Sequence, residues 1–305
     1  MYLWDRAEEK PRSTSTPTPK SDSSSSYEHC VETEADLSDR EMVCDAVRDF
    51  AISGSNIPVE EDRFTKFFID QSEKIRISPP VIYPPFAMED LDTTLVENLR
   101  RLKYNRLLPV QSYAISVILS GGKLVVRAPT GSGKTGAFLI PAIELVIRYH
   151  KSCTRRTDKP LVLILGNTQN LMAQTFDFAC KMAGYSPDTK VSRTQVRILD
   201  LYMGGTSSHR FQQPFEHEIV VATTGGIKKA ISLSKIDLSA LQLLILDEAD
   251  KMVDSRRGFG YDVAEIFSMI PDETRANINV AEFSATFAEG SDEVYLTELD
   301  RELFQ

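Results

Sequence analysis

One stretch of the chain combines the residue types that hold phosphate groups. Residues 128–135 read Ala-Pro-Thr-Gly-Ser-Gly-Lys-Thr, between a Val-rich segment that predicts a strand and a segment that predicts a helix. Small residues let backbone N–H groups approach phosphate oxygens, and the helix N-terminus adds partial positive charge. Lys134 can reach the terminal phosphates, and the Thr135 hydroxyl can ligate Mg²⁺. The candidate phosphate-binding residues are Ala128, Pro129, Thr130, Gly131, Ser132, Gly133, Lys134 and Thr135.

A group of acids supplies a second part of a phosphoryl-transfer site. The apolar segment 243–246 ends in Asp247-Glu248-Ala249-Asp250. An aspartate at the carboxyl end of a buried parallel strand, here Asp247, can hold the Mg²⁺ shell, while Glu248 can orient and deprotonate water. Acid pairs are also common in solvated turns. Together with the phosphate loop, these acids predict a hydrolase that acts on a terminal phosphoryl group.

These residues need a scaffold that brings strand ends together, and the hydrophobic pattern provides one. Apolar segments alternate with helical ones, which predicts an α/β fold with a mainly parallel sheet covered by helices on both faces. The expected strands are 124–127, 161–165, 196–202, 219–222, 243–246 and 278–283. The expected helices between the first of them are 135–149 and 170–183.

The start of the chain has a different composition. Residues 11–26 are dominated by Ser, Thr and Pro, which cannot bury enough apolar surface to offset the entropy of ordering. We therefore expect residues 1–60 to be a mostly disordered, acidic tail, with a weak helical pattern around Val43 as a candidate docking segment for protein partners. Residues 61–85 end in four prolines and predict a linker, and residues 86–305 predict the folded lobe.

Composition excludes several classes of protein. The longest apolar run, residues 137–149, is too short for a membrane span and carries Glu144 and Arg148, and residues 1–10 lack the apolar core of a secretory signal. The four cysteines are scattered, which favours a reducing compartment and argues against structural zinc. The net charge of -9 lies mostly in the tail, so any nucleic acid must be held by a local cleft.

The motifs together resemble those of the DEAD-box RNA helicases, and in particular the Vasa-like branch. The phosphate loop, the literal Asp-Glu-Ala-Asp and the triplet Ser284-Ala285-Thr286 occur in that family's order, and the likeness extends from Phe86 to Thr286. The resemblance implies a RecA-like P-loop domain and ATP hydrolysis coupled to RNA strand separation. It also implies that Asp250, Ser284 and Thr286 couple the two events.

The resemblance also covers the segment that recognises adenine in this family. Tyr104 and Arg106 precede Gln111, as in the family's Q motif, although Leu107-Leu108 stands where the family has Pro-Thr. A side-chain amide can donate to and accept from the adenine edge at once, and an aromatic ring can stack on the base. The implied nucleotide is ATP, bound with Mg²⁺.

The motifs that contact the RNA backbone in this family are less complete here. The residues that match are Thr168, Gly204, Gly205, Thr223 and Gly225. Two arginines of the family pattern are replaced by Gln169 and Gly226. The pair Lys228-Lys229 is a candidate for compensating their charge, although a lysine pair on a helix is more often a solvated face. The sequence therefore predicts a nearly intact ATP side and a weakened RNA side.

Two functional hypotheses remain open. The first is an ATP-dependent RNA helicase represented by its tail and first lobe, since no segment of the chain resembles the family's second lobe with its arginine finger. Such a lobe should hydrolyse ATP slowly, because an arginine finger contributes about 10³ to 10⁵ in rate. The second is a one-lobe pseudo-helicase that binds a protein partner. The Vasa-like resemblance implies ribonucleoprotein work in the cytoplasm or in germ granules, with RNA and protein partners and no membrane association.

Overall fold

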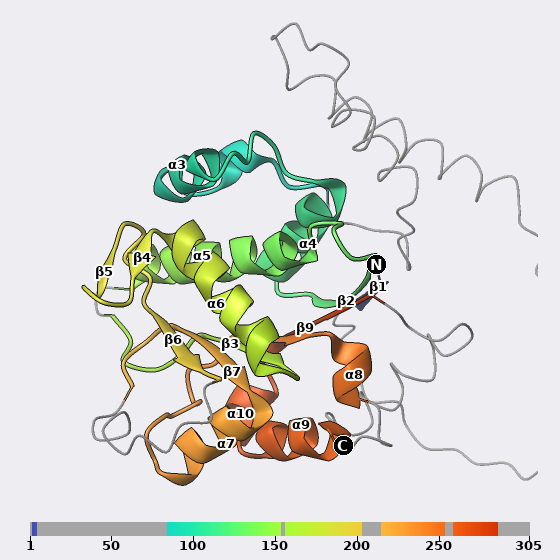
Figure 1. Ribbon diagram of the computed structural model, residues 1–305, viewed down its shortest axis with the longest axis vertical. Helices are drawn as coiled ribbons and strands as arrows, with labels where there is room; N and C mark the ends of the chain where they lie inside the picture. Colours follow the sequence, from blue (N-terminus) through green and yellow to red (C-terminus); the bar gives the residue numbers. More distant parts are fainter. Residues whose placement is uncertain (1, 5–83, 154–155, 203–214, 254–258, 286–305) are drawn as a thin grey trace, which may run out of the picture. The chain divides into compact units, whose positions relative to one another are not determined.

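Short apolar segments assemble into a seven-stranded sheet at the centre of the computed structural model (Figure 1). The structure describes residues 2–4, 84–153, 156–202, 215–253 and 259–285, which belong to one compact unit. The strands are β1 (Tyr2–Trp4), β2 (Lys123–Arg127), β3 (Val162–Gly166), β6 (Ile198–Leu201), β7 (Ile219–Thr223), β8 (Leu243–Asp247) and β9 (Asn279–Ser284). Their order is β1-β2-β9-β8-β3-β7-β6, and only β1 runs antiparallel to its neighbour.

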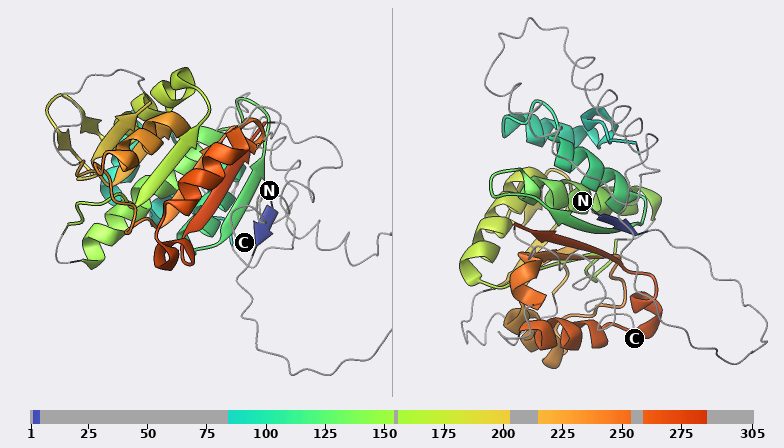
Figure 2. Two further views of the ribbon diagram at one scale, coloured as in Figure 1. Left: turned by 90° about the horizontal axis from the view of Figure 1, so that it is seen from below. Right: turned by 90° about the vertical axis from the view of Figure 1, so that its right-hand side faces the viewer.

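Helices cover both faces of this sheet (Figure 2). On one side lie α3 (Thr93–Arg101), α4 (Pro109–Leu119), α5 (Lys134–Ser152) and α6 (Gln169–Ala183), and on the other lie α7 (Thr224–Ser232), α8 (Ala249–Val253) and α9 (Phe259–Ser268). The remaining elements are the 3₁₀ turn η1 (Met88–Asp90), the short helix α10 (Asp272–Arg275) and the hairpin strands β4 (Tyr185–Ser186) and β5 (Val191–Ser192). The observed architecture confirms the predicted α/β class.

The two hydrophobic cores follow from the alternation of side chains along each strand. In β3, Val162 and Ile164 belong to the core under α4 and α5, whereas Leu163 and Leu165 belong to the core under α7 and α9. Every residue of β3 is buried, as expected for a parallel strand with helices on both faces. This two-sided burial explains why the strand sequences are continuous apolar runs.

The predicted elements from residue 124 to residue 283 are confirmed, with ends that differ by a few residues. The helix predicted over 135–149 extends over Lys134–Ser152, and of the segment 196–202 only Ile198–Leu201 is strand. The strand β1 was not expected, because it lies within the predicted tail. The rest of that tail, and the linker up to residue 83, lie outside the described residues. In the part of the chain that the structure describes, no helix has the length and apolar character needed to cross a membrane.

Candidate nucleotide-binding site

Three neighbouring strands bring the predicted chemical groups to one edge of the sheet. Strand β9 lies between β2 and β8, so the phosphate loop after β2 and the acids at the end of β8 flank the end of β9. Ser284 pairs with Arg127 in the sheet register, and its carbonyl oxygen accepts the Ala128 N–H at 3.1 Å. Asp247 pairs with Phe283. Residues that are more than 100 positions apart in the sequence thus meet at the carboxyl edge, where ligands of open α/β sheets bind.

The loop itself has the backbone geometry of a phosphate cradle. Gly131 and Gly133 adopt φ angles of 84° and 92°, which L side chains rarely adopt. A Cβ atom at Gly133 would lie 2.7 Å from Leu108 Cδ1 and 2.9 Å from Gln111 Nε2, so these side-chain ends would have to shift. A Cβ atom at Gly131 would meet nothing within 4 Å. The loop is therefore open at Gly131 and tightly packed at Gly133.

An unpartnered hydroxyl in the loop fits a phosphate ligand. Ser132 is 5% exposed, and its Oγ has no hydrogen-bond partner. A buried hydroxyl without a partner costs free energy, and a phosphate oxygen would satisfy it. Thr135, in the first turn of α5, is partly buried and could supply the hydroxyl ligand for Mg²⁺.

Lys134 is bound to its own loop in this structure. Its ammonium group donates to the carbonyl oxygen of Ala128 and, at 2.9 Å, to that of Pro129. Burial lowers the pKa of Lys134, although the carboxylates of Asp247, Asp250 and Glu248 act in the opposite direction. A triphosphate would replace two neutral carbonyl acceptors with anionic ones, which form stronger hydrogen bonds with an ammonium group.

Asp247 is an unusual carboxyl group. It is 5% exposed, and burial, together with the neighbouring charge of Glu248, raises its pKa to about 6. Its Oδ1 accepts the Glu248 N–H at 3.0 Å. The charge of Lys134 acts in the opposite direction but does not offset the cost of burying this carboxylate, and a divalent cation would compensate it. The donor set of Asp247 and Thr135 fits Mg²⁺, which prefers oxygen ligands.

Glu248 is held in a specific orientation. Its backbone has φ of 56°, in the left-handed region, and its Oε1 lies 2.9 Å from Lys251 Nζ. The side chain is 33% exposed, so water can reach it. Sequence reasoning identified Glu248 but missed Lys251, whose position three residues later on α8 was the only available signal.

Removing the charge of Asp247 is expected to stabilise the nucleotide-free protein. Because its folded pKa is raised from 3.8 to about 6, this group contributes stability below pH 3.8 that is lost as the pH rises through about 6. Asp247→Asn should therefore raise the free energy of unfolding at pH 7.5 by about 1–3 kcal/mol. Urea denaturation at pH 7.5 and pH 4 measures this, and the gain should shrink toward zero at pH 4.

The control is Asp237→Asn, because Asp237 pairs with Lys159 at 2.8 Å. Partial burial raises the pKa of Asp237, but the hydrogen bonds from Lys159 and Ser239 lower it overall, so this substitution should destabilise the protein at neutral pH. If Asp247→Asn were also destabilising at pH 7.5, the charge of Asp247 would not be a cost in the folded state.

The residues predicted to recognise adenine lie beside the phosphate loop. Gln111 is 1% exposed; its Oε1 accepts the Leu108 N–H at 2.8 Å, and its Nε2 donates to the Gly133 carbonyl at 3.2 Å. The Tyr104 hydroxyl lies 3.4 Å from the place of a Cβ at Gly136, in the first turn of α5. The structure therefore brings Tyr104 and Gln111 to the site, and their contact with adenine stays a prediction. Arg106 is partly exposed on the segment between them.

Of the residues predicted to contact RNA, the described ones lie at or just after the ends of two neighbouring strands, β3 and β7. Thr168 caps α6 by accepting the Leu171 N–H, and Thr223 caps α7 by accepting the Gly226 N–H. Because Gly166 pairs with Thr223 between β3 and β7, the two helix N-termini are adjacent. Asp250 lies on α8. Gly204, Gly205 and Thr286 lie outside the described residues.

Two expectations for the RNA side need correction. Lys228 donates to Asp262 and Glu265, both at 2.7 Å, so it is held by two carboxylates on α9 and is not positioned to replace an arginine. At Gly226, a Cβ atom would lie 1.6 Å from the Leu201 carbonyl oxygen. Position 226 therefore has no room for an arginine or for any other side chain, because a side chain there would displace α7 from β6.

A matched pair of glycine substitutions tests this packing. Gly226→Ala should lower the free energy of unfolding by about 2–3 kcal/mol, because overpacking against backbone leaves no flexible group to move. Gly225→Ala, one residue earlier on α7, meets nothing within 4 Å and should be neutral or slightly stabilising, since alanine favours helix. Thermal and urea unfolding measure both. Equal stability of the two variants would show that α7 does not approach β6 as described.

Comparisons with known proteins point to one family. Residues 108–294 match the family model described as DEAD/DEAH box helicase. The chain is 34% identical over 215 residues to the probable ATP-dependent RNA helicase DDX4 of Macaca fascicularis, which covers 70% of this chain and 28% of that protein. It is 33% identical over 211 residues to the probable ATP-dependent RNA helicase ddx3 of Dictyostelium discoideum, which covers 66% of this chain and 28% of that protein.

Solved structures show the same fold. Dbp5 of S. cerevisiae bound to RNA and ADP BeF3 matches with a TM-score of 0.56 at 18% identity, over 70% of this chain and 48% of that one. The chain thus spans less than a third of the length of the curated relatives named above and about half of the solved structure. The family model alone covers more than half of the present sequence. The chain therefore belongs to the DEAD/DEAH box helicase family.

Proposed function

We propose that this chain binds Mg-ATP at the carboxyl edge of its sheet and acts as the first RecA-like lobe of an ATP-dependent RNA helicase. The observation that carries the proposal is the meeting of the phosphate loop, Asp247-Glu248 and Ser284 across β2, β9 and β8. If Gly-Lys-Thr were only a chance turn after β2, we would not expect the buried acid Asp247 at the end of β8, which is separated from β2 by one strand.

The residues have separable roles in the proposed reaction. Lys134 leaves the carbonyls of its own loop and donates to the β- and γ-phosphates, while Thr135 and Asp247 hold Mg²⁺. The metal ion, when bound, neutralises charge that develops on the phosphate oxygens. Glu248 orients a water molecule and accepts its proton as the water oxygen bonds to the γ-phosphorus and ADP departs.

Coupling to RNA is proposed to run through the end of β9. Ser284 contacts the phosphate loop directly, since its carbonyl oxygen accepts the Ala128 N–H. Binding of nucleotide to the loop would therefore change the position of Ser284. The family likeness suggests that Thr286 and Asp250 respond as well. The proposed RNA contacts are Thr168, Gly204, Gly205, Thr223 and Gly225, with the RNA backbone as ligand. On the same likeness we propose work on ribonucleoproteins in the cytoplasm or in granules, with protein partners bound through the N-terminal tail.

Isothermal titration calorimetry with non-hydrolysable nucleotide analogues tests the proposal. An ATP analogue should bind in the presence of Mg²⁺ and more weakly in EDTA, and a GTP analogue should bind more weakly than the ATP analogue because Gln111 and Tyr104 lie beside the loop. Absence of binding to either analogue would refute the nucleotide site. Equal affinity for both would leave the site but remove the adenine-recognition role of Gln111.

A second candidate function is a one-lobe ATP-binding module that regulates a protein partner. The observation that favours it is the neutral RNA side, where Gln169 and Gly226 replace arginines and Lys228 is held by Asp262 and Glu265. Binding of single-stranded RNA separates the two functions. A helicase lobe should bind RNA with an affinity that falls steeply with salt, because phosphate contacts release counterions. ATP binding without any RNA binding would favour the regulatory module.

A further inference from the structure

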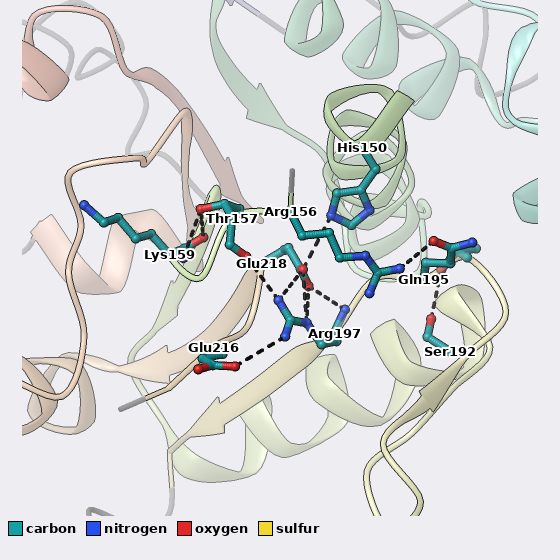
Figure 3. Close-up of polar contacts among 10 residues, drawn as sticks. His150, Arg156, Thr157, Lys159, Ser192, Gln195, Arg197, Glu216 and Glu218 are labelled. Atoms are coloured by element: carbon teal, nitrogen blue, oxygen red, sulfur yellow. Dashed lines mark hydrogen bonds and ion pairs between the residues drawn. The ribbon is translucent and has the colours of Figure 1, made fainter. Parts of the chain in front are cut away.

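A second group of charged residues lies at the opposite, amino edge of the sheet. Arg197 immediately precedes β6 and Glu218 immediately precedes β7, and His150 lies in the last turn of α5 (Figure 3). This cluster of His150, Arg197 and Glu218 has no part in the proposed nucleotide chemistry, which takes place at the carboxyl edge. It therefore needs an explanation of its own.

Glu218 is the centre of this cluster. Its side chain is 0% exposed, and its carboxylate accepts the Arg197 backbone N–H at 2.9 Å, Nε at 3.1 Å and Nη2 at 2.6 Å. Arg197 Nη2 also donates to the Thr157 carbonyl at 3.1 Å. The pair of Glu218 and Arg197 thus links the starts of β6 and β7, and Arg197 also links them to the loop that follows α5.

His150 faces the same carboxylate without being bonded to it. Its side chain is 11% exposed, and its Nε2 lies 3.4 Å from Glu218 Oε1. Neither ring nitrogen has a hydrogen-bond partner of good geometry. An imidazole that is buried without partners is poised to respond to protonation, because the added proton would have a single carboxylate as its nearest acceptor.

The positively charged groups around His150 disfavour its protonation, because the protonated ring would be a further cation among them. Arg197 approaches from β6, and Arg156, bonded to Gln195, approaches from the loop after α5. Burial raises the pKa of Tyr185 on β4, and the charges of Arg197 and Glu218 act on the same group in opposite directions. Glu216 lies 3.9 Å from Arg197 Nη1 but is exposed. Glu218 is thus the one fully buried carboxylate among the described residues that contact Arg197.

We propose that His150, Glu218 and Arg197 form a proton-sensitive clamp on the edge strand β6. While His150 is neutral, the Glu218 carboxylate pairs with Arg197, and this pair holds the start of β6 in place. When His150 takes up a proton, Glu218 must be shared between the imidazolium and the guanidinium, and the start of β6 loosens.

The sign of the effect follows from the environment of His150. Burial lowers the pKa of His150; Glu218 acts in the opposite direction, and Arg156 and Arg197 add to the lowering. The folded state therefore binds this proton less readily than the unfolded chain. Stability from the neutral imidazole is fully present above about pH 6.5 and is lost as the pH falls below it toward the lowered folded pKa.

Amide hydrogen exchange of Ile198–Leu201 in the full chain tests the clamp. After correction for intrinsic exchange chemistry, the opening constant of these amides should rise as the pH falls from 7 to 5, by up to about tenfold per pH unit for one proton. His150→Gln should remove the part of this rise that His150 contributes. His217→Gln is the comparison variant: burial and Arg197 lower the pKa of His217 to about 4, so its ring adds a separate part of the rise, which this variant removes while the part due to His150 stays.

Nuclear magnetic resonance of the ring nitrogens provides a readout that needs no variant to fold. The chain has only four histidines, so each ring can be followed separately. Protonation of His150 should coincide in pH with the loosening of β6. The proposal fails if β6 loosens while His150 stays neutral, or if His150→Gln keeps the full pH response.

Discussion

Replacing Lys134 by alanine is expected to weaken the binding of a non-hydrolysable Mg-ATP analogue by at least about 100-fold. The ammonium group would form charge-assisted hydrogen bonds with the terminal phosphates, and each such bond contributes roughly 1.5–3 kcal/mol. A 100-fold loss corresponds to about 2.7 kcal/mol, so one or two lost bonds suffice. Isothermal titration calorimetry measures the change.

The stability of the same variant distinguishes a binding role from a folding role. Among the described residues Lys134 donates to the carbonyl oxygens of Ala128 and Pro129, and burial lowers its pKa. Its removal should therefore change the melting temperature of the free protein little. Lys159→Ala is the matched control, because Lys159 pairs with Asp237 and Ser239 away from the loop and should leave nucleotide affinity unchanged. Unaltered affinity in Lys134→Ala would exclude the proposed phosphate contact.

The sheet could be predicted from the sequence because its strands carry their own evidence. Five-residue apolar segments such as Val162–Gly166 are buried on both faces, and their alternation with helical segments indicates a parallel sheet with helices on both sides. The strand β1 could not be predicted, since three residues next to a polar tail give no periodic pattern. Its pairing with β2 depends on the tertiary structure.

The candidate site could be predicted where local sequence determines local structure. The loop from Ala128 to Thr135 has its strand, glycines and helix in one continuous segment. The packing of Gly226 against Leu201 and the pairing of Lys228 with α9 involve residues that are 25 or more positions apart. No spacing rule reports such contacts. The sequence therefore could not decide between charge compensation and a solvated helix face for Lys228, and it could not show which atoms lie against Gly226.

The cluster around Glu218 could not be predicted from the sequence either. In the sequence Arg197, Glu218 and His150 are ordinary charged and polar residues that flank apolar segments. Their relation appears only when β6 and β7 pair and the end of α5 lies beside them. A buried ion pair of this kind is costly to break, because either partner alone would be an unpaired charge in the protein interior.

The glutamate beside the metal-binding acid is expected to control hydrolysis and not nucleotide binding. Glu248→Gln should lower the rate of ATP hydrolysis by about 10²- to 10⁴-fold, the usual contribution of a general base. Glutamine has the same shape, so it should tolerate the backbone at φ of 56°, and it removes a negative charge that raises the pKa of Asp247. Asp247 should then be ionised at lower pH, which favours Mg²⁺.

Two measurements on the Glu248→Gln variant separate these effects. Calorimetry should give an affinity for the Mg-ATP analogue within about threefold of the parent, because the proposed phosphate and metal contacts come from the loop and Asp247. Single-turnover hydrolysis should be measured with RNA and a DEAD-box second lobe supplied in trans, since an arginine finger contributes about 10³ to 10⁵ in rate. Glu265→Gln on α9, whose partner is Lys228, is the matched control and should retain parental hydrolysis. Hydrolysis at the parental rate in Glu248→Gln would mean that water is activated by another group, and the role assigned to Glu248 would be wrong.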